Sequence, residues 1–123
     1  MTDSYEMKQT NLAKPTYIYF HICCIGQWIS IINQSFRYMK EMGLYDNVDC
    51  IKCFLLGKDY KLPPCLKEPK IKIIDTNPDI KLYERFTLNR LWDDCQKEDF
   101  NFFYIHSKGV SKIYFGKLRA NWI

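Results

Sequence analysis

Apolar residues along this chain follow two kinds of pattern, short runs rich in apolar residues and longer stretches with helical spacing. The runs are rich in aromatic and β-branched residues and predict four buried strands, at residues 17–22, 48–56, 71–74 and 100–105. The helically spaced stretches predict two amphipathic helices, at residues 27–42 and 84–97. The predicted elements therefore follow one another in the order β-α-β-β-α-β.

Each predicted helix has one apolar face, which we expect to lie in the core. In the first helix this face holds Trp28, Ile29, Ile32, Phe36 and Met39. In the second it holds Leu88, Leu91, Trp92 and Cys95, spaced at i, i+3, i+4 and i+7. Gly43 follows the first helix and is well placed to end it in a left-handed conformation.

Polar and proline-rich segments separate these elements. Residues 58–69 contain three prolines and predict a loop, and the Asp-Thr-Asn-Pro segment at residues 75–78 predicts a turn. The pattern of residues 110–115 is ambiguous, and residues 117–123 resemble the start of a further helix. The polar residues 1–14 predict a flexible N-terminus, which leaves residues 15–123 as a single domain.

Strands that alternate with helices predict an α/β fold, a Rossmann-like mainly parallel sheet covered on both faces. Ligands of such sheets bind outside the carboxyl ends of the strands, where the strand order reverses. Both histidines, two lysines and three glycines stand at or just after the ends of predicted strands: His21, Gly26, Gly57, Lys58, His106, Lys108 and Gly109. Together with Cys23 and Ser107, these residues suit a phosphorylated ligand, because glycine admits a close backbone and lysine supplies charge.

Composition narrows the possible functions. The 123 residues are 47% hydrophobic and carry 18 Lys plus Arg against 14 Asp plus Glu, a net charge of +4. This composition excludes a disordered or low-complexity chain, and the modest charge without a basic run disfavours a nucleic-acid partner. The sequence has no membrane span or secretory signal, and its six cysteines lie mostly in apolar runs, so we expect a cytoplasmic protein with reduced thiols.

Several chemical motifs can be weighed directly. Cys50-x-x-Cys53 lies inside a predicted strand, where the two side chains point to opposite faces, so neither a zinc site nor a redox site is favoured. The chain lacks the glycine-rich dinucleotide motif, the P-loop and the Gly-x-Ser-x-Gly elbow. Of the neighbouring acids Asp93 and Asp94, we expect at least one to be solvated surface.

A larger set of motifs is similar to a known family. YIYFHIC-x2-G-x-W, GLYD, FLLG, KIKIID, LYERFTLNRLW and FFYIHSKGV-S together resemble a glycosyltransferase-like family of large DNA viruses and some bacteria. The resemblance covers about residues 17–123 and implies the N-terminal, nucleotide-binding half of a GT-A-like fold. It implies a viral protein that binds a nucleotide-sugar donor and transfers the sugar to a carbohydrate or protein acceptor.

The resemblance also suggests roles for individual residues. It assigns donor binding to the end of the first strand, to the start of the second helix and to the end of the fourth strand: His21, Cys23, Tyr83, Glu84, Thr87, His106, Ser107, Lys108 and Gly109. GT-A enzymes carry a metal-binding Asp-x-Asp motif after the fourth strand, where this chain has His106-Ser107-Lys108. The resemblance leaves a Mn²⁺ or Mg²⁺ ion as a possible cofactor. Because the Asp-x-Asp motif is absent, however, we expect Lys108, helped by His106, to neutralise the diphosphate.

The same family continues into a C-terminal, acceptor-binding half that this sequence does not include. The catalytic residues are therefore unknown. The alternative is a catalytically incompetent truncated relative that serves as a nucleotide-binding or interaction module. An incomplete half would expose apolar surface, so self-association is possible.

Overall fold

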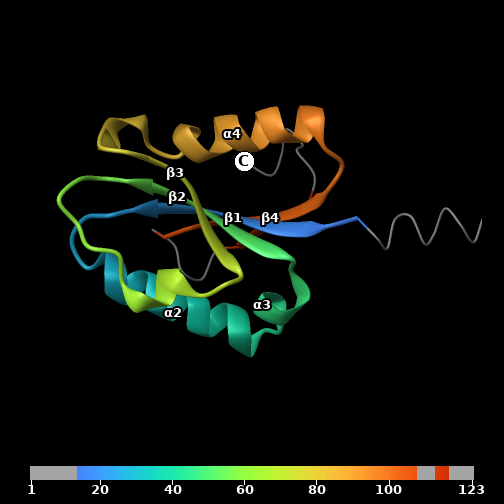
Figure 1. Cartoon of the computed structure of the whole chain (residues 1–123), viewed down its shortest axis with the longest axis horizontal. Coiled ribbons are helices and arrows are strands. Elements are labelled where there is room, and N and C mark those ends of the chain that lie inside the picture. The colour runs from blue at the N-terminus through green and yellow to red at the C-terminus, as the bar shows by residue number, and fades with distance from the viewer. Residues whose placement is uncertain (1–13, 108–112, 117–123) are drawn as a thin grey trace, which may run out of the picture.

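A computed structural model describes residues 14–107 and 113–116, which form an α/β domain (Figure 1). The predicted C-terminal helix and most of the predicted N-terminal segment lie outside the described residues. The main elements are β1 (Thr16–Cys23), α2 (Trp28–Glu41), α3 (Leu44–Asn47), β2 (Cys50–Leu56), β3 (Ile71–Asn77), α4 (Arg85–Lys97), β4 (Asn101–His106) and β5 (Ile113–Gly116). Two short 3-10 helices, η1 (Pro64–Lys67) and η2 (Ile80–Leu82), precede β3 and α4.

The strands form one sheet in the order β3-β2-β1-β4-β5. β1 pairs in parallel with both β2 and β4, and β2 pairs in parallel with β3. The predicted Rossmann-like, mainly parallel α/β fold is therefore confirmed. The ambiguous segment contributes β5, which pairs antiparallel with β4.

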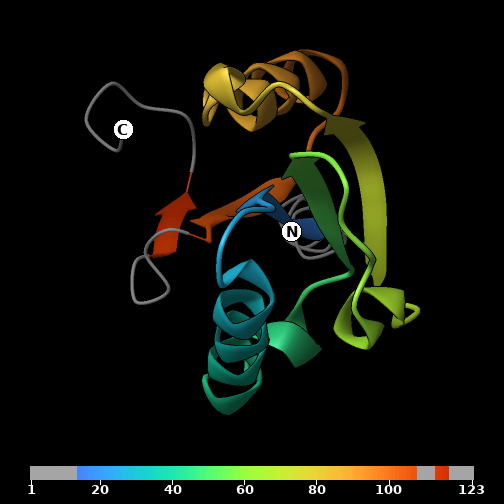
Figure 2. The ribbon, with the colours of Figure 1, turned by 90° about the vertical axis from the view of Figure 1, so that its left-hand side faces the viewer.

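The two long helices cover opposite faces of the sheet (Figures 1 and 2). Figure 2 looks onto the carboxyl ends of the parallel strands, with α4 above the sheet and α2 below it. Both helices match their predicted ranges closely, and Gly43 follows α2 with a φ of +80°. This left-handed glycine ends α2 as expected.

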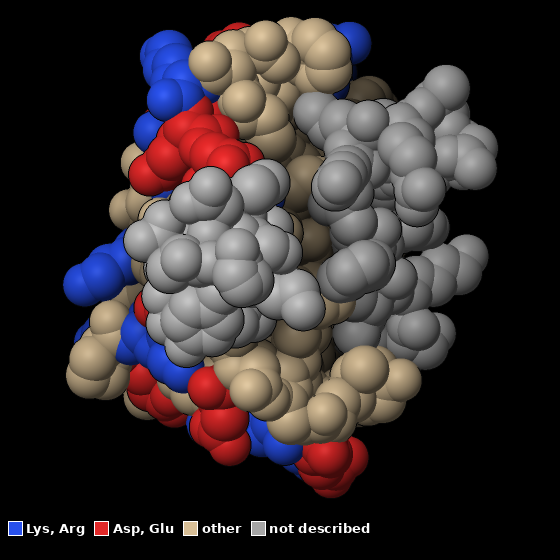
Figure 3. Space-filling view, turned by 90° about the vertical axis from the view of Figure 1, so that its right-hand side faces the viewer, with Lys and Arg blue, Asp and Glu red and all other residues tan. Residues whose placement is uncertain are grey.

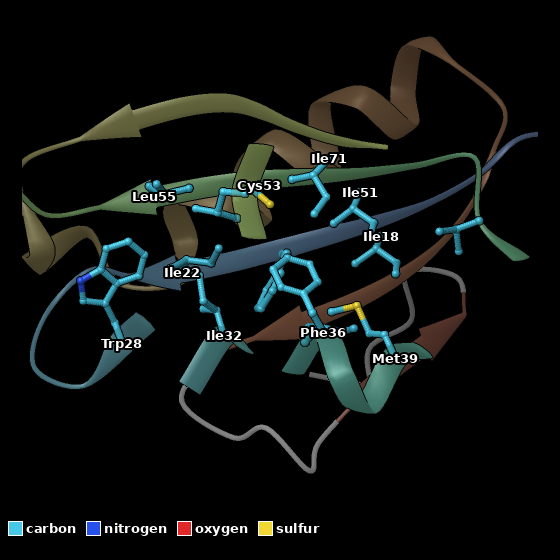
Figure 4. Close-up of a cluster of buried hydrophobic side chains, with 14 of the residues drawn as sticks. Ile18, Ile22, Trp28, Ile32, Phe36, Met39, Ile51, Cys53, Leu55 and Ile71 are labelled. Atoms are coloured by element: carbon cyan, nitrogen blue, oxygen red, sulfur yellow. The ribbon is translucent and has the colours of Figure 1, made fainter. Parts of the chain in front are cut away.

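The core between the sheet and α2 is mainly aliphatic, with Phe20, Trp28 and Phe36 among its buried residues (Figure 4). Ile18 and Ile22 of β1 are fully buried there against Ile32 and Met39 of α2, and Trp28 packs beside them. Alternate residues of a strand point to opposite faces, so Tyr19 and His21 lie on the α4 side. The alternation of β1 thus separates a mainly aliphatic layer from a mainly aromatic one.

The layer beneath α4 is aromatic. Tyr19 stacks on Phe54 and Phe100, with ring centroids 5.6 and 5.8 Å apart, and Leu91 of α4 is fully buried against this group. The ammonium of Lys52 lies over the Tyr17 ring at 4.1 Å from its centroid. The aliphatic stem of a lysine can cover rings in this way while its charge stays hydrated.

Three local predictions were wrong. Residues 75–77 extend β3 rather than form a turn, because they continue the pairing with β2 beyond an irregularity at Cys53/Phe54. Trp92 and Ile29 do not lie in the core; their side chains are 55% and 39% exposed, since Leu91 and Ile32 occupy the centres of the two helix faces. The short helix α3 follows Gly43, in a stretch for which no element was predicted.

The edge of the sheet opposite the carboxyl ends carries mixed charge. Figure 3 shows acidic and basic side chains interspersed on this side of the molecule. Lys14 and Asp99, which precede β1 and β4, form an ion pair of 3.1 Å. Within the described residues, no helix combines the length and the apolar composition needed to cross a membrane.

Candidate functional site

The carboxyl ends of β1 and β4 meet at the topological switch point of the sheet. From β1 the chain continues through α2 on one face, whereas β4 is reached through α4 on the other face. His21 and His106 are register partners at these two strand ends. In open α/β sheets, ligands bind outside the carboxyl ends of the strands at such a switch point, and we call this place, outside the ends of β1 and β4, the crevice.

Ser107 ties the two strand ends together. Its backbone N–H donates to the carbonyl of His21 at 2.9 Å, and its hydroxyl accepts from the backbone N–H of Cys23 at 3.2 Å. Ser107 is only 5% exposed. Its backbone and side chain therefore hold the ends of β1 and β4 in a fixed relative position.

His21 is a buried histidine held by α4. Its Nδ1 atom lies 2.6 Å from the hydroxyl oxygen of Thr87, which is fully buried. Burial lowers the pKa of His21 to about 4; the nearby Glu84 carboxylate raises that pKa and His106 lowers it further. The imidazole is therefore neutral at neutral pH and stays a hydrogen-bonding group rather than a cation.

Glu84 and Tyr104 join the start of α4 to β4. The Tyr104 hydroxyl donates to Oε1 of Glu84 at 2.5 Å, and the Tyr104 ring stacks on His106 with centroids 6.2 Å apart. Tyr104 is nearly fully buried, whereas Glu84 is half-buried. The carboxylate thus has a fixed position at the border between the core and the crevice.

An ordered turn leads into α4. The side chain of Asn77 accepts from the N–H of Asp79, and that of Asp79 accepts from the N–H of Lys81, both at 2.9 Å. The turn ends at Tyr83, whose φ of 52° and ψ of −152° belong to a region that favours glycine. Its side chain is 67% exposed beside Glu84.

The start of α2 borders the same crevice. The helix begins five residues after β1, with Gly26 at a φ of +60° and no acidic residue in its first turn. A Cβ atom added at Gly26 would meet nothing within 4 Å. The unpaired N–H groups of a first turn and the helix dipole favour a negatively charged ligand.

The structure brings most of the predicted site residues together. His21, Cys23, Thr87, Glu84, His106 and Ser107 gather around one end of β1 and β4, and Tyr83 lies beside them. Thr87 and Ser107 are buried, and their side chains hydrogen-bond to His21 and to the backbone of Cys23. Lys108 and Gly109 lie outside the described residues. Sequence reasoning missed Tyr104, although its position two residues before His106 puts both on one face of β4.

The described residues show neither a metal site nor a disulfide. Among residues 14–107 and 113–116, no three His, Cys, Asp or Glu side chains are grouped so as to hold a metal ion. The six cysteines all remain thiols.

Comparison of the chain with protein-family models, curated proteins and solved structures finds no match. The fold and the site residues therefore carry the functional argument.

Proposed function

We propose that this protein binds a nucleotide-sugar donor in the crevice between the carboxyl ends of β1 and β4, as a glycosyltransferase-like protein. The observation that carries the proposal is the polar cluster at the switch point, where His21, Glu84 and His106 converge from three elements. Switch points of doubly wound sheets are the usual sites for nucleotides. The motifs that resemble a glycosyltransferase-like family support the choice of a nucleotide-sugar.

The two sides of the crevice suit different parts of such a donor. The start of α2, with Gly26 and without acidic residues, suits the diphosphate. The α4 side holds the Glu84 carboxylate, which repels phosphate and accepts hydrogen bonds from hydroxyl groups. A donor is therefore expected to lie with its diphosphate toward α2.

Sugar transfer would break the bond between the anomeric carbon and the diphosphate oxygen. An acceptor hydroxyl oxygen forms the new bond and loses its proton to a base, while the nucleoside diphosphate keeps the electron pair. His106 and Lys108 are the candidates for neutralising the charge that develops on that leaving group. A divalent cation remains an alternative for the same task.

A binding or interaction module without turnover is the second candidate. Its support is that two buried polar groups of the site, Thr87 and Ser107, already make hydrogen bonds within the fold. In this case the crevice binds the donor but no sugar is transferred.

Calorimetric titration with UDP-, GDP- and TDP-sugars, with and without a chelator, tests the proposal. We expect saturable binding of at least one donor, with sugar transfer or slow hydrolysis for the enzyme and without either for the module. Absence of binding across the panel would overturn both candidates. Strict Mn²⁺ dependence would assign the diphosphate to a metal rather than to Lys108.

A matched pair of variants tests the position of the diphosphate. Gly26→Asp introduces a carboxylate at the start of α2, and Gly26→Asn introduces the same shape without charge. Both residues tolerate a φ of +60° better than most, and the space around Gly26 is open. We expect the Asp variant to weaken donor binding about ten-fold through like-charge repulsion, and the Asn variant to bind nearly as the wild type.

A further inference from the structure

Two tyrosines on the sheet donate hydrogen bonds to carboxylates of the same helix. Tyr19 of β1 donates to Oδ2 of Asp94 at 2.6 Å, and Tyr104 of β4 donates to Oε1 of Glu84 at 2.5 Å. Both tyrosines are buried in the aromatic layer beneath α4. Each pair joins a tyrosine of the sheet to a carboxylate at α4 through one hydrogen bond. The two pairs differ in what surrounds the carboxylate.

Both oxygens of the Asp94 carboxylate accept hydrogen bonds within the fold. Its second oxygen, Oδ1, accepts from Nε of Arg90 at 3.1 Å, one turn earlier on α4. The carboxylate is therefore neutralised and bonded at both oxygens. It closes the aromatic layer, and each of its oxygens already has a partner within the fold.

The Glu84 carboxylate is different. Tyr104 holds one oxygen, and no hydrogen bond or ion pair from the described residues reaches the other oxygen, Oε2. Glu84 is the residue before α4, at the carboxyl edge of the sheet, and it acts electrostatically on His21. Asp94 lies ten positions further along, about 15 Å at 1.5 Å per residue.

A carboxylate of this kind selects a particular partner. Ionised carboxylates only accept hydrogen bonds, so Oε2 excludes phosphate and favours groups that carry hydroxyl donors. A vicinal pair of hydroxyls can share one carboxylate, as the ribose does in dinucleotide-binding sheets. Because Tyr104 fixes the carboxylate beforehand, little conformational freedom is lost when the ligand binds.

We propose that Glu84 recognises a vicinal hydroxyl pair of the bound donor, on its ribose or on the transferred sugar. This assignment rests on the proposed function and adds a specificity residue to it. Tyr104 acts as the positioning residue that holds Glu84. The same carboxylate sets the direction of the donor, since it keeps the diphosphate on the α2 side.

The test compares nucleotides with and without each candidate pair of hydroxyls. The probe is the nucleoside diphosphate that binds best among UDP, GDP, ADP and CDP, with its 2′,3′-dideoxy form and the matching nucleotide-glucose. For a ribose contact, we expect the wild type to prefer the ribose form about ten-fold. For a contact with the sugar, the nucleotide-glucose should instead bind about ten-fold more tightly than the nucleoside diphosphate.

Variants assign the preference to Glu84. Glu84→Gln keeps an acceptor for Tyr104 and removes the charge, so the difference in affinity between ligands with and without the hydroxyl pair should become smaller. Glu84→Ala should abolish that difference. Asp94→Asn is the control, because it alters the matching tyrosine–carboxylate pair away from the crevice. It should leave the preference unchanged. Circular dichroism checks that each variant is folded.

The outcomes separate this inference from the proposed function. Nucleotide binding without either preference, or a preference that persists in Glu84→Ala, would overturn the role of Glu84 and leave the nucleotide site standing. Equal loss of preference in Asp94→Asn would also overturn it. If none of the nucleotides binds the wild type, the proposed function fails and this inference fails with it.

Discussion

The Nδ1 atom of His21 lies 2.6 Å from the hydroxyl oxygen of Thr87, a contact between residues 66 positions apart in the sequence. It joins the end of β1 to the first turn of α4, and both residues are buried. Because neither group reaches bulk water, each depends on the other for its hydrogen bond. The pair therefore fixes α4 above the crevice.

Removing the Thr87 hydroxyl should destabilise the protein. Thr87→Val keeps the size of the side chain but leaves Nδ1 of His21 without this partner. We expect the free energy of unfolding to fall by about 1–3 kcal/mol, the cost of a buried unsatisfied polar group. Urea denaturation measures the change. Thr87→Ser keeps the hydroxyl and should lose less than Thr87→Val; the reverse order would contradict the role of this hydrogen bond.

The buried His21 should make stability depend on pH. Burial lowers the pKa of His21 from about 6.5 to about 4 in the folded state, so the unfolded chain binds the extra proton between these values. Stability from this group is therefore complete above pH 6.5 and is lost as the pH falls toward 4. The shift corresponds to about 3 kcal/mol as an upper value.

His21→Gln tests this pH dependence, since glutamine is polar and does not titrate. We expect the unfolding free energy of the wild type to fall more steeply between pH 6.5 and 4 than that of the variant. The groups facing His21 are Thr87, Glu84 and His106, and all three remain in the variant. Parallel pH profiles for the two proteins would show that His21 does not titrate in this range.

Relief of backbone strain at Tyr83 should stabilise the chain. Its φ of 52° with a ψ of −152° is a conformation that glycine adopts freely, and its side chain is exposed. We expect Tyr83→Gly to raise the unfolding free energy by about 1 kcal/mol, the strain relieved less the added entropy of the unfolded glycine. Tyr83→Ala retains the Cβ atom and the strain. A glycine variant less stable than the alanine variant would contradict this reading.

Gly57 should not tolerate a side chain. Its φ is +138°, and a Cβ atom there would lie 3.0 Å from Cβ and 3.1 Å from the carbonyl oxygen of Cys24. We expect Gly57→Ala to cost about 2 kcal/mol or more, because backbone must move as well as side chain. Gly26→Ala is the control, with open space and a φ of +60°, and should cost about 1 kcal/mol. Thermal unfolding compares the two.

The candidate site was only partly predictable. The rule that parallel strands end at one edge correctly brought His21 near His106, because it depends on strand direction alone. The division between surface and support was not predictable. Thr87 was expected to bind ligand and is fully buried, and Tyr104 was overlooked although it holds Glu84. The burial of a side chain depends on which helix covers which strand, and this packing cannot be predicted from the local sequence.

The sequence by itself determined the kind and order of the main elements, because the spacing of apolar residues is a local property. The apolar run of β1 and the helical spacing in α2 and α4 could be recognised from a few neighbouring residues. Only the tertiary structure decided that β1 lies between β2 and β4, that β3 continues through residues 75–77, and that Trp92 faces outward. These features arise from contacts between residues distant in sequence, where packing and strand pairing outweigh local preference.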